Sequence, residues 1–117
     1  MRRLAFLALA LCLMLPAIAW AETAYVPGTE DVPLMPGLTA RSDGPLIFDK
    51  PQGRIVEATA TGAVKREQVL SFYRSSLPEL GWHQKGEHDF DRSGERLSLD
   101  FKGHDGALTV GFTLSPR

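Results

Sequence analysis

Two histidines lie next to carboxylates in the second half of the chain, and together these groups could hold a divalent metal ion. His88 is followed by Asp89 and Asp91, and His104 is followed by Asp105 in a glycine-flanked turn. Imidazole nitrogen and carboxylate oxygen are common ligands of such ions. On an extended strand, however, neighbouring side chains point to opposite faces, so His88 would face away from Asp89 and Asp91. The spacing therefore favours a solvent-exposed strand and turn over a metal site.

The sequence offers little for nucleophilic or acid–base catalysis. None of its serines stands in a Gly-x-Ser-x-Gly motif, and it has no glycine-rich phosphate-binding loop. Glu57 and Asp100 could be drawn as a pair of catalytic carboxylates, but the surface of any strand offers such pairs. A short chain with a single helix also leaves little volume for a buried pocket. We therefore expect no enzyme activity, no catalytic or metal-ligating residue and no cofactor.

Hydrophobic periodicity predicts the elements that position these residues. Residues 46–48 and 54–61 are two strands of a hairpin, closed by a turn with Pro51 and Gly53. Residues 65–80 form the one predicted helix, because its large apolar side chains recur on one face. These side chains are Val69, Phe72, Tyr73, Leu77 and Leu80. Pro78 is expected to kink the last turn of the helix, and Gly81 to end it.

Three further strands are predicted at residues 83–92, 97–102 and 108–114. In the last two, apolar and polar residues alternate, as in a strand with one buried face. The fold class is therefore α+β with the order ββαβββ, an antiparallel sheet with one helix packed on one face and a polar opposite face. We expect Trp82 to be buried where the helix meets the sheet, and the neighbouring His83 to lie on the surface.

The first 21 residues have the three parts of a secretory signal peptide. Arg2 and Arg3 precede an apolar run at residues 4–15, Pro16 interrupts it, and Ala-Trp-Ala at 19–21 gives a cleavage site. The run is shorter than the about 20 residues of a membrane span. We expect cleavage after Ala21, with cleavage after Ala19 as the alternative. The protein is then periplasmic or secreted and has no stable membrane anchor.

Cleavage would change the composition of the chain. Cys12 is the only cysteine, and bulky Leu11 before it disfavours a lipoprotein signal. Loss of Arg2 and Arg3 would leave 11 of the 13 basic residues against 14 acidic ones, a net charge of about −3. This balance argues against a nucleic-acid partner and against a polybasic membrane patch. The 96 residues after the leader suffice for one domain with a modest core.

Residues 22–45 are predicted to form an extended arm ahead of an α+β domain at residues 46–117. The arm carries prolines that prevent a helix or a central strand, namely Pro27, Pro33, Pro36 and Pro45. It also carries an apolar cluster, namely Val32, Leu34, Met35 and Leu38. One interpretation is that the cluster folds back over the core of the domain. The other is that it docks onto a partner, since extended proline-containing segments lose little entropy on binding.

One pattern covers the helix and the residues after it. It reads Val69-x-x-Phe72-Tyr73-x-x-x-Leu77-x-x-x-Gly81-Trp82. The pattern resembles a stretch of small exported bacterial α+β domains in which a helix ends in Gly-Trp and leads into an antiparallel sheet. It is also loosely similar to domains of BamC-type envelope lipoproteins.

A wider pattern extends over nearly the whole chain after the leader and is similar to a group of small exported alphaproteobacterial proteins of unknown activity. Its further parts are Asp31-Val32-Pro33-Leu34-Met35-Pro36-Gly37-Leu38, Phe48-Asp49-x-Pro51-x-Gly53-Arg54-Ile55 and Phe112-Thr113-Leu114-Ser115-Pro116. The resemblance implies export and the fold, and it implies no activity.

The expected function is that of an exported, non-catalytic domain that binds a protein or an envelope component. The contact surfaces would be the apolar cluster of the arm and the exposed edge of the sheet. One alternative is a small hydrolase or metal-dependent enzyme that uses His88 and nearby acids. Convergence of His83, His88, His104 and the acids within about 5 Å would favour it. The other alternative is a small-ligand carrier, which needs a cavity between helix and sheet.

Overall fold

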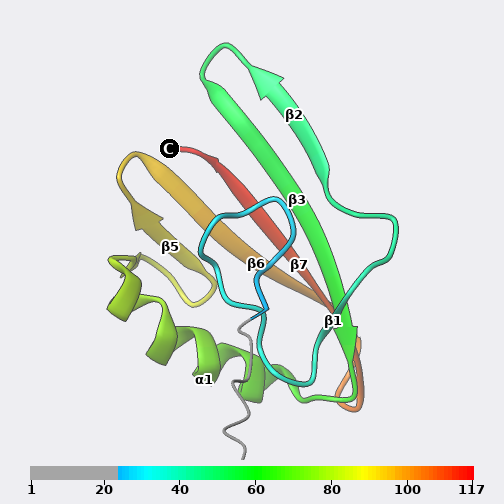
Figure 1. Cartoon of the computed structure of the whole chain (residues 1–117). Helices are drawn as coiled ribbons and strands as arrows, with labels where there is room; N and C mark the ends of the chain where they lie inside the picture. The colour runs from blue at the N-terminus through cyan, green and yellow to red at the C-terminus, as the bar shows by residue number, and fades with distance from the viewer. Residues whose placement is uncertain (1–23) are drawn as a thin grey trace, which may run out of the picture.

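The computed structural model describes residues 24–117 (Figure 1). These residues form an antiparallel sheet of seven strands with one α-helix packed against one face, which confirms the predicted α+β class. The predicted signal peptide at residues 1–21 and the first two residues of the arm lie outside the described residues.

The strands of the sheet differ in length and in their place across it. They are β1 (Thr39–Ala40), β2 (Leu46–Lys50), β3 (Gly53–Gly62), β4 (His83–Gln84), β5 (Asp89–Arg92), β6 (Glu95–His104) and β7 (Ala107–Pro116). Their order is β1-β3-β7-β6-β5-β4, and β2 pairs with β3 on the same side as β1. Strand β7 therefore lies between β3 and β6 and joins the two halves of the sheet.

Two parts of the sheet differ from the prediction. Residues 83–92, expected as one strand, fold back on themselves so that β4 pairs with β5. The turn between them is closed by the backbone amides of Lys85 and Gly86, which both donate to the carbonyl of Asp89. Strand β1 is an additional strand within the arm, and it pairs with β3 at Ala60 and Thr61.

Helix α1 (Arg66–Ser76) is shorter than predicted. Pro78 cannot continue the α-helical hydrogen bonds, and a 3₁₀ turn, η2 (Pro78–Leu80), follows. Gly81 ends this turn with a φ of 93°, a left-handed conformation that favours glycine. Because a 3₁₀ turn has three residues rather than 3.6 per turn, it moves Leu80 off the buried face. Leu80 is 38% exposed, and its prediction as a face residue is wrong.

The core lies between one face of the sheet, called the covered face here, and a layer formed by α1 and the arm. Val69 and Tyr73 of α1 and Leu77, the residue directly after the helix, are fully buried in it. The sheet contributes alternate residues of β3, β6 and β7 together with Phe90 of β5. Trp82 is also buried, at the junction of helix and sheet, which confirms its prediction.

The arm completes this layer, and Figure 1 shows it in blue and cyan in front of the central strands. Its buried apolar residues belong to the same core as those of α1 and the sheet; they are Val26, Val32, Met35 and Leu38. Gly62 of β3 permits the close approach, because a side chain there would collide with the carbonyl oxygen of Gly37. The arm is therefore an integral part of the domain and covers its core.

Candidate functional site

Strand β2 is exposed along its whole length, although three of its five residues are large and apolar. Leu46 is 60% exposed, Ile47 41% and Phe48 43%. The register with β3 places Ile47 opposite the buried Val56, on the covered face. Because side chains alternate along a strand, Leu46 and Phe48 point to the opposite, uncovered face. Apolar side chains are thus presented on both faces of one strand.

The position of the β2–β3 hairpin explains this exposure. The hairpin forms as predicted, with Lys50 opposite Gly53 and a two-residue loop between them. Figure 1 shows its tip projecting beyond α1 and the arm. The pairing of β3 with β7 begins only at Val56, so residues 53–55 extend past it. The layer that covers the core therefore does not extend over β2.

The outer edge of β2 is open to another strand. Among residues 24–117, β2 pairs with β3 alone. An edge strand presents a row of backbone donors and acceptors, and exposed apolar side chains increase its tendency to pair with another chain. The other edge of the sheet is different, because β4 has two residues there, the exposed and polar His83 and Gln84. The features that favour strand pairing are thus concentrated on β2.

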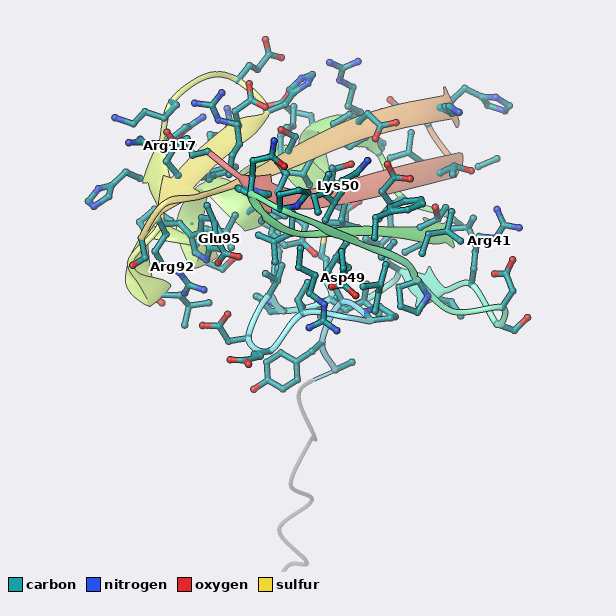
Figure 2. All side chains as sticks on the ribbon, turned by 90° about the horizontal axis from the view of Figure 1, so that it is seen from above. Arg41, Asp49, Lys50, Arg92, Glu95 and Arg117 are labelled. Atoms are coloured by element: carbon teal, nitrogen blue, oxygen red, sulfur yellow. The ribbon has the colours of Figure 1, made fainter. Side chains whose placement is uncertain are left out.

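Charged residues lie at both ends of β2. Asp49 and Lys50 form its last two positions, and just before the strand Arg41 makes an ion pair of 3.3 Å with Asp43. Figure 2 shows Asp49 on the side of the arm and Lys50 on the opposite side of the hairpin. Such charges around an apolar centre favour one orientation of a partner over another.

The structure keeps the three histidines in separate settings. The ring nitrogen Nε2 of His88 lies 2.9 Å from a guanidinium nitrogen of Arg66 and 3.4 Å from a carboxylate oxygen of Glu87. The ring also packs edge-on against Phe101, with 5.5 Å between centroids. His83 is in β4 and His104 ends β6. Within residues 24–117, no three His, Cys, Asp or Glu side chains gather closely enough to hold a metal ion.

The aspartates considered as metal ligands make structural contacts. A carboxylate oxygen of Asp105 accepts a 2.9 Å hydrogen bond from the backbone amide of Arg66, so the β6–β7 turn caps the start of α1. Asp89 accepts a 2.7 Å hydrogen bond from the hydroxyl of Ser98 on β6. The suggested carboxylate pair of Glu57 and Asp100 is divided between β3 and β6, which have β7 between them.

Asp91 is the one charged side chain among residues 24–117 that is buried. Its carboxylate accepts hydrogen bonds of 2.8 and 3.1 Å from Arg96 and of 3.0 Å from Arg117. The two hydrogen bonds from Arg96, and to a smaller extent the one from Arg117, lower the pKa of Asp91 to about 2. These hydrogen bonds connect β5 with β6 and hold Arg117 next to β5.

The four residues suggested for partner binding in the arm belong to the core or pack against it. Val32, Met35 and Leu38 are buried, and Leu34 is half-buried beside them. A partner could contact the buried side chains only if the arm left the domain. These residues therefore belong to the core or pack against it in this structure, whereas three consecutive exposed apolar side chains lie on β2.

A cavity of about 220 Å³ lies between the arm and the sheet, where Trp82 and Arg92 meet residues 28–32. Arg92 stacks over the Trp82 ring at 4.3 Å and makes two hydrogen bonds, of 2.9 and 3.0 Å, to Asp31. The guanidinium group of Arg92 is therefore already taken up by contacts within the domain. The cavity is smaller than the about 300–1,000 Å³ typical of small-molecule sites, and its place differs from the helix–sheet cavity that a carrier was expected to need.

Comparisons of the chain with protein-family models, curated proteins and solved structures give no match. The resemblance to exported alphaproteobacterial proteins thus stays a prediction. Within residues 24–117, no helix has the length and apolar character required to cross a membrane.

The sequence predicts a contact surface at the edge of the sheet, but it does not identify β2 as that edge. The apolar run at residues 46–48 of β2 is equally typical of a strand that is buried on both faces. The charged pair that follows, Asp49 and Lys50, was the available signal that the strand is exposed.

Proposed function

We propose that this chain is an exported, non-catalytic binding domain that pairs strand β2 with an extended segment of another protein chain. The observation that carries the proposal is the exposure of Leu46, Ile47 and Phe48 on a strand whose outer edge is free within the described residues. In strand addition, backbone hydrogen bonds supply affinity, and alternate side chains on each face supply specificity.

The chemistry of β2 indicates the kind of segment that fits. Because Leu46 and Phe48 lie on one face and Ile47 on the other, the segment needs apolar side chains on both of its faces. A charged residue opposite the apolar centre would lose solvation without gaining a partner. The segment is therefore extended and apolar over about three residues, with charges at its ends.

Export is supported by the signal-peptide pattern of residues 1–21. The net charge of about −3 that remains after removal of Arg2 and Arg3 does not suit nucleic acid, since 11 basic residues then stand against 14 acidic ones. A protein of the cell envelope is the partner that these features favour.

Site-specific cross-linking in the native envelope tests this function. A photoreactive residue replaces Phe48 in one variant and Gln84, on the opposite sheet edge, in a matched control. The Phe48 variant should give a discrete adduct whose cross-linked peptide, identified by mass spectrometry, is an extended apolar segment. The additional substitution Ile47→Lys should abolish this adduct. Equal adducts from both positions, or none from Phe48, would contradict the proposal.

A further inference from the structure

We infer that β2 pairs antiparallel with the β2 strand of a second copy of this chain, about a two-fold axis at Ile47. The inference rests on the proposed function of β2 as a strand-pairing edge and names the partner. It follows from the symmetry of the apolar segment, from the registers that symmetry permits and from the charges at the strand ends.

Symmetry limits how two copies of β2 can pair. Two identical antiparallel strands in one sheet are related by a two-fold axis perpendicular to the sheet, so the same surface is used by both copies. Such an axis passes between a residue and its own counterpart. Residues directly opposite each other point to the same face of the combined sheet. Each permitted register is therefore defined by the residue at the axis.

An axis at Ile47 matches apolar residues throughout the pair. Leu46 then lies opposite the partner's Phe48, and Phe48 opposite the partner's Leu46, both on the uncovered face. Ile47 meets its own counterpart on the covered face. The exposed apolar run is centred on Ile47 and is therefore self-complementary. Apolar cross-strand pairs of this kind stabilise a sheet.

The register whose axis lies one residue later, at Phe48, is much poorer. An axis at Phe48 would place Asp49 opposite the partner's Ile47 and Lys50 opposite the partner's Leu46. Two charged groups from each copy would then lose water against apolar side chains, which is unfavourable without a polar partner.

Charges favour the same register. With the axis at Ile47, Lys50 at the end of β2 approaches the turn that precedes the partner's β2, which carries Asp43. The symmetry repeats this approach of opposite charges at the other end of the pair. Asp43 is exposed and its present partner Arg41 is exposed as well, so neither group is buried in the single chain.

The contact is small, because three apolar residues per copy are far fewer than the about 20–30 residues of a standard interface. The dimer should therefore be weak and depend on protein concentration. Sedimentation velocity over two orders of magnitude of concentration should show exchange between monomer and dimer. Ile47→Lys should keep the protein monomeric, whereas Gln84→Lys on the opposite edge should leave the dimer unchanged.

Cysteine trapping tests the register itself. Cys12 is the only cysteine, so a Cys12→Ser background removes any other thiol. Ile47→Cys should form a disulfide-linked dimer on mild oxidation, because opposite Cα atoms in an antiparallel pair are about 4.5–5.5 Å apart, within disulfide range. Leu46→Cys and Phe48→Cys should each fail alone, since a two-residue offset separates their Cα atoms by roughly 8 Å. A mixture of these two variants should cross-link.

The outcomes separate this inference from the proposed function. A covalent dimer of Phe48→Cys without one of Ile47→Cys would overturn the register and with it the inference. A protein that stays monomeric and does not cross-link through Ile47→Cys, while Phe48 photo-cross-links to a different protein, overturns the second copy as partner and supports the proposed function. Absence of any adduct at β2 in both experiments contradicts both.

Discussion

The hydroxyl group of Tyr73 donates a 2.7 Å hydrogen bond to the carbonyl oxygen of Pro33, 40 residues earlier in the chain. The same oxygen of Tyr73 accepts a 3.1 Å hydrogen bond from the backbone amide of Met35. The buried side chain of Tyr73 therefore holds the arm through two backbone groups of the arm, the carbonyl of Pro33 and the amide of Met35. Burial raises the pKa of Tyr73 well above its ordinary value near 10, so the hydroxyl stays neutral and can donate.

Tyr73→Phe tests this link between helix and arm. The substitution retains the ring but leaves the carbonyl of Pro33 and the amide of Met35 without their partner, at a cost of about 1–3 kcal/mol in the free energy of unfolding. Urea denaturation measures the loss, and Tyr25→Phe, at an exposed tyrosine, serves as the control. Equal midpoints for the two variants would show that the arm does not depend on Tyr73.

Met35→Ala tests whether the arm covers the core in solution. Met35 is buried, so its truncation should lower the free energy of unfolding by about 2–5 kcal/mol. The half-buried Leu34 gives the matched variant Leu34→Ala, which should cost clearly less. Deletion of residues 22–42 should destabilise the domain further. A deletion that melts at an unchanged temperature would instead indicate an arm free to dock elsewhere.

Trp82→Ala should be among the most damaging single substitutions. Trp82 is buried and also supports Arg92, which stacks over its ring. Truncation of a large buried aromatic costs about 3–5 kcal/mol, a large part of the stability of a small domain. Leu80→Ala, two residues earlier and partly exposed, should change the urea midpoint little. A loss below about 1 kcal/mol for Trp82→Ala would contradict its place in the core.

Acid should weaken the domain partly through Asp91. The pKa of this carboxyl is lowered from 3.8 to about 2 in the folded protein, so the folded state favours the charged form. The stability that it contributes is present above pH 3.8 and is lost as the pH falls towards 2. Urea midpoints measured between pH 5 and pH 2, roughly the interval over which such a carboxylate is protonated, should fall less for Asp91→Asn than for the natural protein. Asp49→Asn, at an exposed site, should retain the natural slope.

Export predicts a defined N-terminus. The Ala-Trp-Ala sequence at 19–21 should direct cleavage so that the protein begins at Glu22. Intact mass spectrometry of the periplasmic fraction checks this. Recovery of the chain with Met1 still attached in the membrane fraction would refute the export prediction.

The sequence allowed the class of fold to be predicted because local patterns determine it. Residues 97–102 and 108–114 alternate between apolar and polar side chains, which identifies strands with one buried face. Val69, Tyr73 and Leu77 recur at helical spacing, which identifies a helix with one buried face. The division of residues 83–92 into β4 and β5 was missed, since Gly86 is one weak turn signal within an apolar-poor stretch. The cap of α1 by Asp105 was missed because it joins positions 39 residues apart.

The exposure of the candidate site could not be predicted from local sequence patterns. Residues 46–48 have the composition of a buried strand, and their exposure depends on how far the arm and α1 extend over the sheet. How far the arm and α1 extend is set by tertiary contacts between segments that are distant in the sequence. Conversely, the sequence left open whether the apolar cluster of the arm covers the core or docks onto a partner, and the arm is buried because Tyr73 and Gly62 provide a place for it.

The central position of β7 has a consequence for the order in which the domain can form. Strands β3 and β6 each pair with β7, which is the last strand in the sequence. A chain that emerges from a ribosome or a membrane channel with its N-terminus first cannot join the two halves of the sheet until residues 107–116 have emerged. Such non-local pairing also slows folding. For a chain that is exported as proposed, the two halves of the sheet would therefore join only after residues 107–116 have crossed the membrane.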